Sequence, residues 1–134
     1  MQKLTEIEGI ADTTCEKLNA AGCNCVDSLL KNGSTPKGRA EIAEKSGVSP
    51  KLVLKFVNHA DLFRIKGVAG QFAELLELAG VDTVPELAQR NAANLHAKLV
   101  ECNEAKHTCK VVPSESQIQG FIDQAKDLPR AINY

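Results

Sequence analysis

Aromatic residues are scarce in this sequence, which has four phenylalanines, one tyrosine and no tryptophan. An exposed platform of rings, on which single-stranded nucleic acids stack their bases, therefore has little material here. Charge of one sign is also lacking, because 17 acidic residues nearly cancel 16 basic ones and leave a formal net charge of −1. Without a global positive field, any contact with a nucleic acid has to be local.

Long apolar runs are missing as well. No run approaches the roughly 18 residues that a membrane span needs, and residues 1–6 lack the apolar stretch of a signal peptide. We therefore expect a cytoplasmic protein that does not enter a membrane. The five cysteines form an odd set, which favours reduced thiols over disulfides.

The motifs of common enzyme and metal sites do not occur. There is no phosphate-binding glycine loop, no nucleophile elbow and no pair of metal-binding histidines on one helix. Cys23 and Cys25 are separated by a single residue, unlike the cysteine pairs of structural zinc sites, and Cys102, His107 and Cys109 do not define a tetrahedral site. We expect a binding module that is not an enzyme and has neither metal nor cofactor.

The sequence does contain an internal repeat. Leu4–Ala11 matches Leu62–Ala69 at an offset of 58 positions, with Gly9 aligned to Gly67. The match continues through small and apolar positions: Cys15 with Ala73, Leu18 with Leu76, Gly22 with Gly80, Cys23 with Val81, Val26 with Val84, and Leu29 with Leu87. After about seven extra residues in the second copy it resumes, and Phe56 aligns with Phe121. We predict two units, 1–60 and 61–128, and a tail, 129–134.

Both units have helical periodicity. Apolar side chains recur at the spacing of one helix face in two sets: Phe72, Leu75, Leu76 and Ala79, and Ile118, Phe121, Ile122 and Ala125. Helix starts are indicated by Ser49 before Pro50 and by the capping-box pairs Thr83 with Glu86 and Ser114 with Gln117. No segment alternates as a strand would, so we predict an all-α fold.

The breaks between the helices resemble helix-hairpin-helix motifs. Ile7–Ala11 and Ile65–Gly70 each place a glycine between hydrophobic residues, and weaker second hairpins follow at Lys45–Pro50 and at Lys110–Ser114, the last without glycine. In this motif the glycine permits a tight turn, and the next helix presents free amides to an anion. The resemblance implies two tandem repeats, each a pair of helix-hairpin-helix elements, packed as one compact domain.

Nearly the whole chain also resembles a family of small proteins classed only as a domain of unknown function. The segments that carry this resemblance are Thr35–Arg39, Ala60–Leu62, Arg64–Val68 and Ala88–Asn91. The family implies a fold more than an activity. In the wider helix-hairpin-helix superfamily, hairpin amides bind DNA phosphates without reading sequence, and hairpin carbonyls sometimes hold a monovalent cation.

The four hairpins are not equally suited to bind phosphate. Glu6, Glu8 and Asp12 crowd the first one and repel an anion, whereas Arg64 and Lys66 flank the third. The candidate nucleic-acid-binding residues are Arg64, Lys66, Gly67, Val68, Gly70, Lys45, Gly47, Lys51 and Lys110.

Three functions follow as hypotheses. The first is sequence-independent binding of the phosphate backbone of double-stranded DNA. The second is a protein-interaction or scaffold module with no nucleic-acid role, and the third is a site for a small anionic ligand between the two units. A glycine between two helices is equally well explained as the turn that lets them pack.

Overall fold

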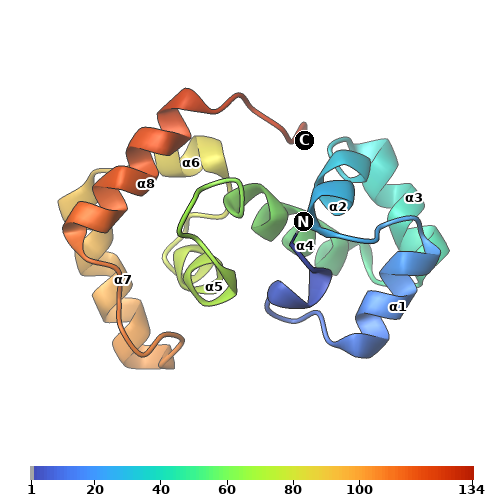
Figure 1. Ribbon diagram of the computed structural model, residues 1–134, viewed down its shortest axis with the longest axis horizontal. Coiled ribbons are helices and arrows are strands. Elements are labelled where there is room, and N and C mark those ends of the chain that lie inside the picture. Colours follow the sequence, from blue (N-terminus) through green and yellow to red (C-terminus); the bar gives the residue numbers. More distant parts are fainter. Residues whose placement is uncertain (1) are drawn as a thin grey trace. The chain divides into compact units, whose positions relative to one another are not determined.

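The protein is described here by a computed structural model that places residues 2–134 (Figure 1). These residues form one short 3-10 helix and eight α-helices and contain no strand, which confirms the all-α prediction. The elements are η1 (Leu4–Glu6), α1 (Asp12–Ala20), α2 (Val26–Asn32), α3 (Pro36–Ser46), α4 (Pro50–Leu62), α5 (Gly70–Leu78), α6 (Val84–Ala88), α7 (Ala92–Lys106) and α8 (Glu115–Asp127). None of these helices is long and apolar enough to cross a membrane.

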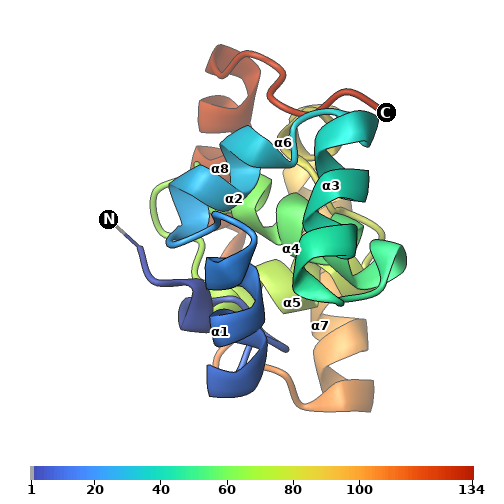
Figure 2. The ribbon, with the colours of Figure 1, turned by 90° about the vertical axis from the view of Figure 1, so that its right-hand side faces the viewer.

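The chain divides into two compact units. Unit 1 comprises Met1–Asp61 together with Arg130–Tyr134, and unit 2 comprises Leu62–Pro129. In unit 1, α1 and α2 pack on α3 (Figure 2). In unit 2, α6 and α7 pack on α8, and α5 packs on α7. Of the predicted tail, 129–134, residues 130–134 are thus part of the first unit and Pro129 is part of the second.

Most helix starts are fixed by local hydrogen bonds. The Ser114 hydroxyl accepts from the Gln117 amide at 3.2 Å while the Gln117 side chain accepts from the Ser114 amide at 2.9 Å, which confirms the expected capping box. The Ser49 hydroxyl accepts from the Leu52 amide at 3.3 Å, so Ser49 caps α4 as expected. The capping box expected from Thr83 is wrong: its side chain forms no capping bond to α6.

The ends of α1 and α5 have the same geometry. Both helices end in a Schellman motif, in which a glycine takes a left-handed conformation, with φ of 89° at Gly22 and 91° at Gly80. The Cys23 amide donates to the Leu18 carbonyl at 2.9 Å, and the Val81 amide donates to the Leu76 carbonyl at 2.8 Å. Because the side chains of these four residues are buried as well, each motif joins a turn to the core of its unit.

The turns before α1 and α5 also agree. The φ angle is 95° at Gly9 and 96° at Gly67, a region that favours glycine. Both turns lie against a phenylalanine of their own unit. A Cβ atom on Gly9 would lie 3.3 Å from Cε1 of Phe56 on α4, and one on Gly67 would lie 2.9 Å from Cε1 of Phe121 on α8. The glycines therefore serve both the turn and its close packing.

Candidate nucleic-acid interface

The hairpin that the sequence singled out lies between α4 and α5, in unit 2. The Ile65 amide donates to the Leu62 carbonyl at 3.1 Å, and the Val68 amide donates to the Ile65 carbonyl at 3.2 Å. These bonds close two consecutive tight turns. Val68 is only 3% exposed and Gly70 is buried, so neither offers a side-chain surface to a ligand.

Gln124 of α8 holds this hairpin at Lys66. Its Oε1 accepts from the Lys66 amide at 2.9 Å, and its Nε2 donates to the Lys66 carbonyl at 3.2 Å. The Lys66 amide is therefore already bonded, whereas its side chain is exposed. Sequence reasoning missed Gln124, although it lies three residues after Phe121 and hence on the same helix face.

Arg64 is partly buried, and its guanidinium forms a hydrogen bond within unit 2. Its Nη2 donates to the Pro129 carbonyl at 2.6 Å, which ties the hairpin to the segment that follows α8. A phosphate would have to share this guanidinium with Pro129. Lys66 is therefore the better placed of the two flanking cations, because its side chain is exposed.

The first turn of α5 has neither a capping side chain nor an acidic residue. Ala69 is the N-cap residue and makes no side-chain capping bond, and the first turn contains no acidic residue. The amides of Gly70, Gln71 and Phe72 have no acceptor within the helix, because the first amides of any helix lack an intrahelical partner. They point along the positive end of the helix dipole, the arrangement that attracts phosphate.

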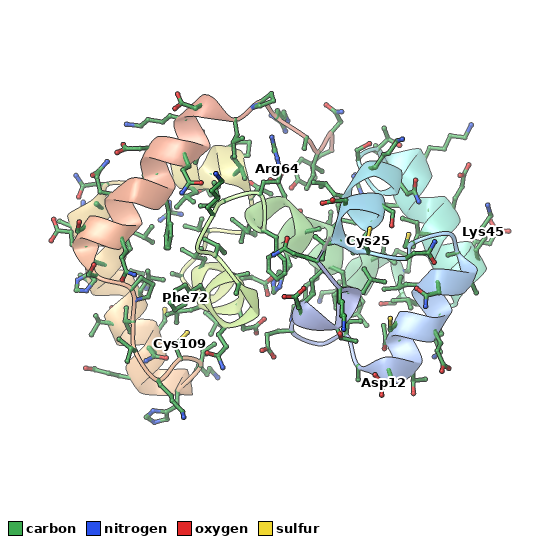
Figure 3. All side chains as sticks on the ribbon, in the orientation of Figure 1. Asp12, Cys25, Lys45, Arg64, Phe72 and Cys109 are labelled. Carbon is green, nitrogen blue, oxygen red and sulfur yellow. The ribbon has the colours of Figure 1, made fainter. Side chains whose placement is uncertain are left out.

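The corresponding helix of unit 1 has the same backbone but a different charge. Ala11 is the N-cap of α1 and, like Ala69, makes no side-chain capping bond. Asp12 lies in the first turn of α1 (Figure 3), so the helix carries its own negative charge where a phosphate would bind. Glu8, in the turn before it, is exposed. The two helices therefore differ electrostatically in the direction that the sequence predicted.

The second hairpin of unit 1 offers less to an anion. Gly47 ends α3 in a left-handed conformation with φ of 75°, and Lys45 and Lys51 are exposed on either side of it. However, Pro50 has no amide hydrogen, and the Ser49 hydroxyl already accepts from the amide of Leu52. Few free donors remain at this helix start.

Lys110 lies in the last hairpin, between α7 and α8. The loop is held by Asn103, whose Oδ1 accepts from the Cys109 amide at 2.8 Å and whose Nδ2 donates to the Cys109 carbonyl at 2.9 Å. His107, with φ of 52°, provides the left-handed residue in this glycine-free loop. Because Ser114 caps α8, the exposed Lys110 side chain is the main feature here that attracts anions.

The candidate residues thus fall into two groups. Lys45, Gly47 and Lys51 belong to unit 1, and Arg64, Lys66, Gly67, Val68, Gly70 and Lys110 belong to unit 2. Within unit 2, the structure brings Lys66, Gly67 and the open end of α5 together in one hairpin.

All five cysteines are free thiols. Cys23 is buried, as expected for a small core residue, and burial raises its pKa. Cys15 is partly exposed, although the repeat aligns it with Ala73, which is buried. The Sγ atoms of Cys102 and Cys109 lie 3.6 Å and 3.4 Å from two different backbone carbonyl oxygens, those of Leu78 and Gln71.

Cys25 differs from the other thiols. It is partly exposed, and its Sγ lies 3.5 Å from the Ser28 hydroxyl, one turn further along α2. Hydrogen bonds from the side chain and backbone of Ser28 hold the pKa of the Cys25 thiol below its ordinary value of 9.0. This residue is the most acidic of the thiols for which a shift is resolved.

Comparison with known proteins gives a family but no activity. No curated protein and no solved structure matches the chain significantly. One protein family matches residues 8–128, which include all eight α-helices. The chain belongs to this family, which is described as "Domain of unknown function (DUF4332)".

Proposed function

We propose that the protein is a non-enzymatic module that binds the phosphate backbone of double-stranded DNA without reading its sequence. We further infer that its two units are copies of one pair of helix-hairpin-helix elements. The inference is supported by the matching φ angles of Gly9 and Gly67 and by the matching Schellman motifs that end α1 and α5.

The observation that carries the proposal is the open start of α5. It combines amides that lack an acceptor within the helix, no acid in the first turn and an exposed lysine, Lys66, in the preceding turn. A phosphate oxygen accepts from such amides while the lysine neutralises its charge. These contacts reach only the backbone of DNA, so they carry no base information.

The proposed division of roles assigns phosphate binding to unit 2. Gly67 and the first turn of α5 supply backbone donors, Lys66 supplies charge, and Arg64 and Lys110 add weaker contacts. In unit 1, Lys45, Gly47 and Lys51 provide a secondary surface, and Asp12 keeps α1 from acting as α5 does. With a net charge of −1, binding should fall at the weak end of the range for non-specific contacts, near 10⁻⁴ M at physiological salt.

Fluorescence anisotropy at low salt with two unrelated duplexes tests the proposal. Lys66→Glu should weaken binding to both duplexes equally and reduce the salt dependence by the equivalent of about one phosphate contact. Lys31→Glu, which makes the same change of charge at an exposed residue of α2, is the matched control and should have a smaller effect. Glu8→Lys should strengthen binding, because it removes an acid from the hairpin before α1.

Two results would contradict the DNA proposal. One is an absence of binding by the wild type up to high micromolar protein, and the other is a Lys66→Glu variant that binds no more weakly than Lys31→Glu. Either outcome would favour the protein-interaction alternative.

A further inference from the structure

Residues 130–134 form an extended segment that belongs to unit 1. Although the segment follows α8 of unit 2, it is part of the same compact unit as the first 61 residues. It has no helical structure, and its end lies beside α3 in Figure 2. Its contacts with unit 1 are those of a bound peptide, as the following bonds show.

The main chain of the segment is bonded on both sides at Asn133. Its amide donates to the Ser34 carbonyl at 2.8 Å, and its carbonyl accepts from Nη2 of Arg39 at 3.0 Å. Nη1 of Arg39 donates to the Gly33 carbonyl at 2.9 Å. One arginine thus joins the loop before α3 to the backbone of the segment, and main-chain bonds of this kind are common in the recognition of extended peptides.

The alternate side chains of the segment face unit 1. Ile132 is 2% exposed, whereas the intervening Asn133 is exposed. The Tyr134 hydroxyl donates to Oδ1 of Asn58, a buried residue of α4, at 2.8 Å. The guanidinium carbons of Arg39 and Arg130 lie 5.6 Å and 5.8 Å from the centre of the Tyr134 ring, within the range of cation–π attraction.

Arg39 is unusual for a buried cation. It is only 9% exposed, yet the groups around its guanidinium are two neutral carbonyls and an aromatic ring. A buried charge is normally compensated by an opposite charge. Two of its three neighbours, the Asn133 carbonyl and the Tyr134 ring, come from residues 130–134. The segment therefore supplies part of the environment of Arg39.

We propose that this face of unit 1 is a recognition site for extended peptides, and that residues 130–134 are its resident, displaceable occupant. The site, which we call the Arg39 site, consists of Gly33, Ser34, Arg39 and Asn58. It fits a peptide with an aliphatic residue two positions before an aromatic one and a neutral residue between them. This inference does not depend on DNA binding, which we assigned to unit 2.

The conformational entropy lost by ordering the segment is opposed by little buried apolar surface, so the segment should be displaceable. Fixing five residues without regular structure costs conformational entropy, and only Ile132 among them is buried. Segments with few buried apolar contacts open well before the whole protein unfolds. Because the segment is covalently attached, a competing peptide has to match an effective concentration on the order of 1 mM.

The test uses the full chain labelled with ¹⁵N and an unlabelled acetylated peptide with the sequence of residues 129–134. The amide signal of Asn133 should move to its position in a free peptide, with half-displacement at roughly 1 mM peptide, while the Ser34 and Arg39 amides keep their bound positions. A control peptide with alanine in place of the isoleucine and the tyrosine should have no effect. If the Asn133 signal is unchanged at about 10 mM peptide, the segment is a fixed part of unit 1 and the proposal is wrong.

Two variants test the role of the site itself. Arg39→Ala should release the segment without any peptide, which lowers the fluorescence anisotropy of Tyr134, the only tyrosine in a chain without tryptophan. Tyr134→Ala removes a side chain that is 59% exposed and so leaves the core intact. It should reduce the peptide concentration for half-displacement at least tenfold. An unchanged value for Tyr134→Ala would overturn the proposal even if Arg39→Ala fails to fold.

Discussion

At the scale of single residues, a left-handed backbone is needed at the end of both α3 and α7, and different side chains meet this need. Gly47 takes the position after α3 with φ of 75°, and His107 takes it after α7 with φ of 52°. For a residue with a Cβ atom this conformation costs about 1–2 kcal/mol, whereas glycine adopts it freely. The strain at His107 leads to a prediction about stability.

We expect His107→Gly to raise the free energy of unfolding by about 0.5–1 kcal/mol, since relief of strain exceeds the extra chain entropy of glycine. Urea denaturation followed by circular dichroism measures the change. Ala97→Gly, at an exposed position within α7, is the control and should lower the free energy of unfolding by about 0.5–1 kcal/mol. A loss of stability in both variants would show that the side chain of His107 has a stabilising role.

The thiols allow a prediction that depends on pH. Because the pKa of Cys25 is lowered and that of Cys23 is raised, Cys25 should react with iodoacetamide before Cys23, and its alkylation rate should rise at a lower pH than that of Cys23. Peptide mapping after timed alkylation measures both rates. Ser28→Ala removes the hydroxyl that lowers the Cys25 pKa and should shift its rate profile to higher pH.

The same pKa shift fixes the sign of a stability effect. A thiol whose pKa is lowered by folding stabilises the protein above the ordinary pKa of 9.0, and this contribution is lost as the pH falls through the lower value of the folded state. Removing the thiol should therefore matter most in alkaline solution. Urea denaturation of Cys25→Ala and wild type at neutral and alkaline pH checks the sign, because the difference between the two proteins should grow with pH.

At the scale of elements, local sequence signals located most helix starts but not all. Ser114 with Gln117 and Ser49 with Pro50 behave as their spacing predicts, because each bond joins residues within one turn. Thr83 does not cap α6, and the carboxylate of Glu86, its expected capping-box partner, accepts from Nη2 of Arg90 at 2.8 Å. Arg90 lies four residues after Glu86, just beyond the end of α6, so this ion pair engages the carboxylate that the capping box would use.

The uncapped start of α5 leads to a prediction in which stability and DNA affinity change in opposite directions. Gln71→Glu places an acid in the first turn at an exposed position and should raise the free energy of unfolding by about 0.3–1 kcal/mol. The same negative charge should weaken DNA binding, because it repels the phosphate that we propose binds at the start of α5. Gln71→Lys should do the reverse in both measurements, which are urea denaturation and fluorescence anisotropy. Changes of the same sign in stability and affinity would argue against an anion site at α5.

At the scale of the whole molecule, the sequence predicted correctly those features that depend on short-range patterns. The helices and the turn glycines, such as Gly67, follow from periodicity and spacing within about ten residues. The bonds of Gln124 to Lys66 and the contacts of the Arg39 site join residues far apart in the chain, and no local sequence pattern predicts them. For the same reason, the sequence indicated only a tail over 129–134, whereas long-range bonds place residues 130–134 in unit 1.

The two units should respond separately to damage in their cores. Leu18 of unit 1 and Leu76 of unit 2 are both buried, and substitution of either by alanine should cost about 2–5 kcal/mol. Hydrogen exchange monitored by mass spectrometry should show the faster exchange mainly in the unit that carries the substitution. Equal acceleration across both units for either variant would mean that the chain unfolds only as a whole.

The packing of Gly9 on Phe56 and of Gly67 on Phe121 also has an evolutionary consequence. A lineage cannot enlarge the turn residue while it keeps the ring, nor exchange the ring for a bulkier group while the turn stays in place. Positions 9 and 56 should therefore covary among homologues, and so should positions 67 and 121. The two pairs are free to drift independently, because each ring belongs to the same unit as its glycine. In a family alignment, the two pairs of columns should therefore each covary, independently of one another.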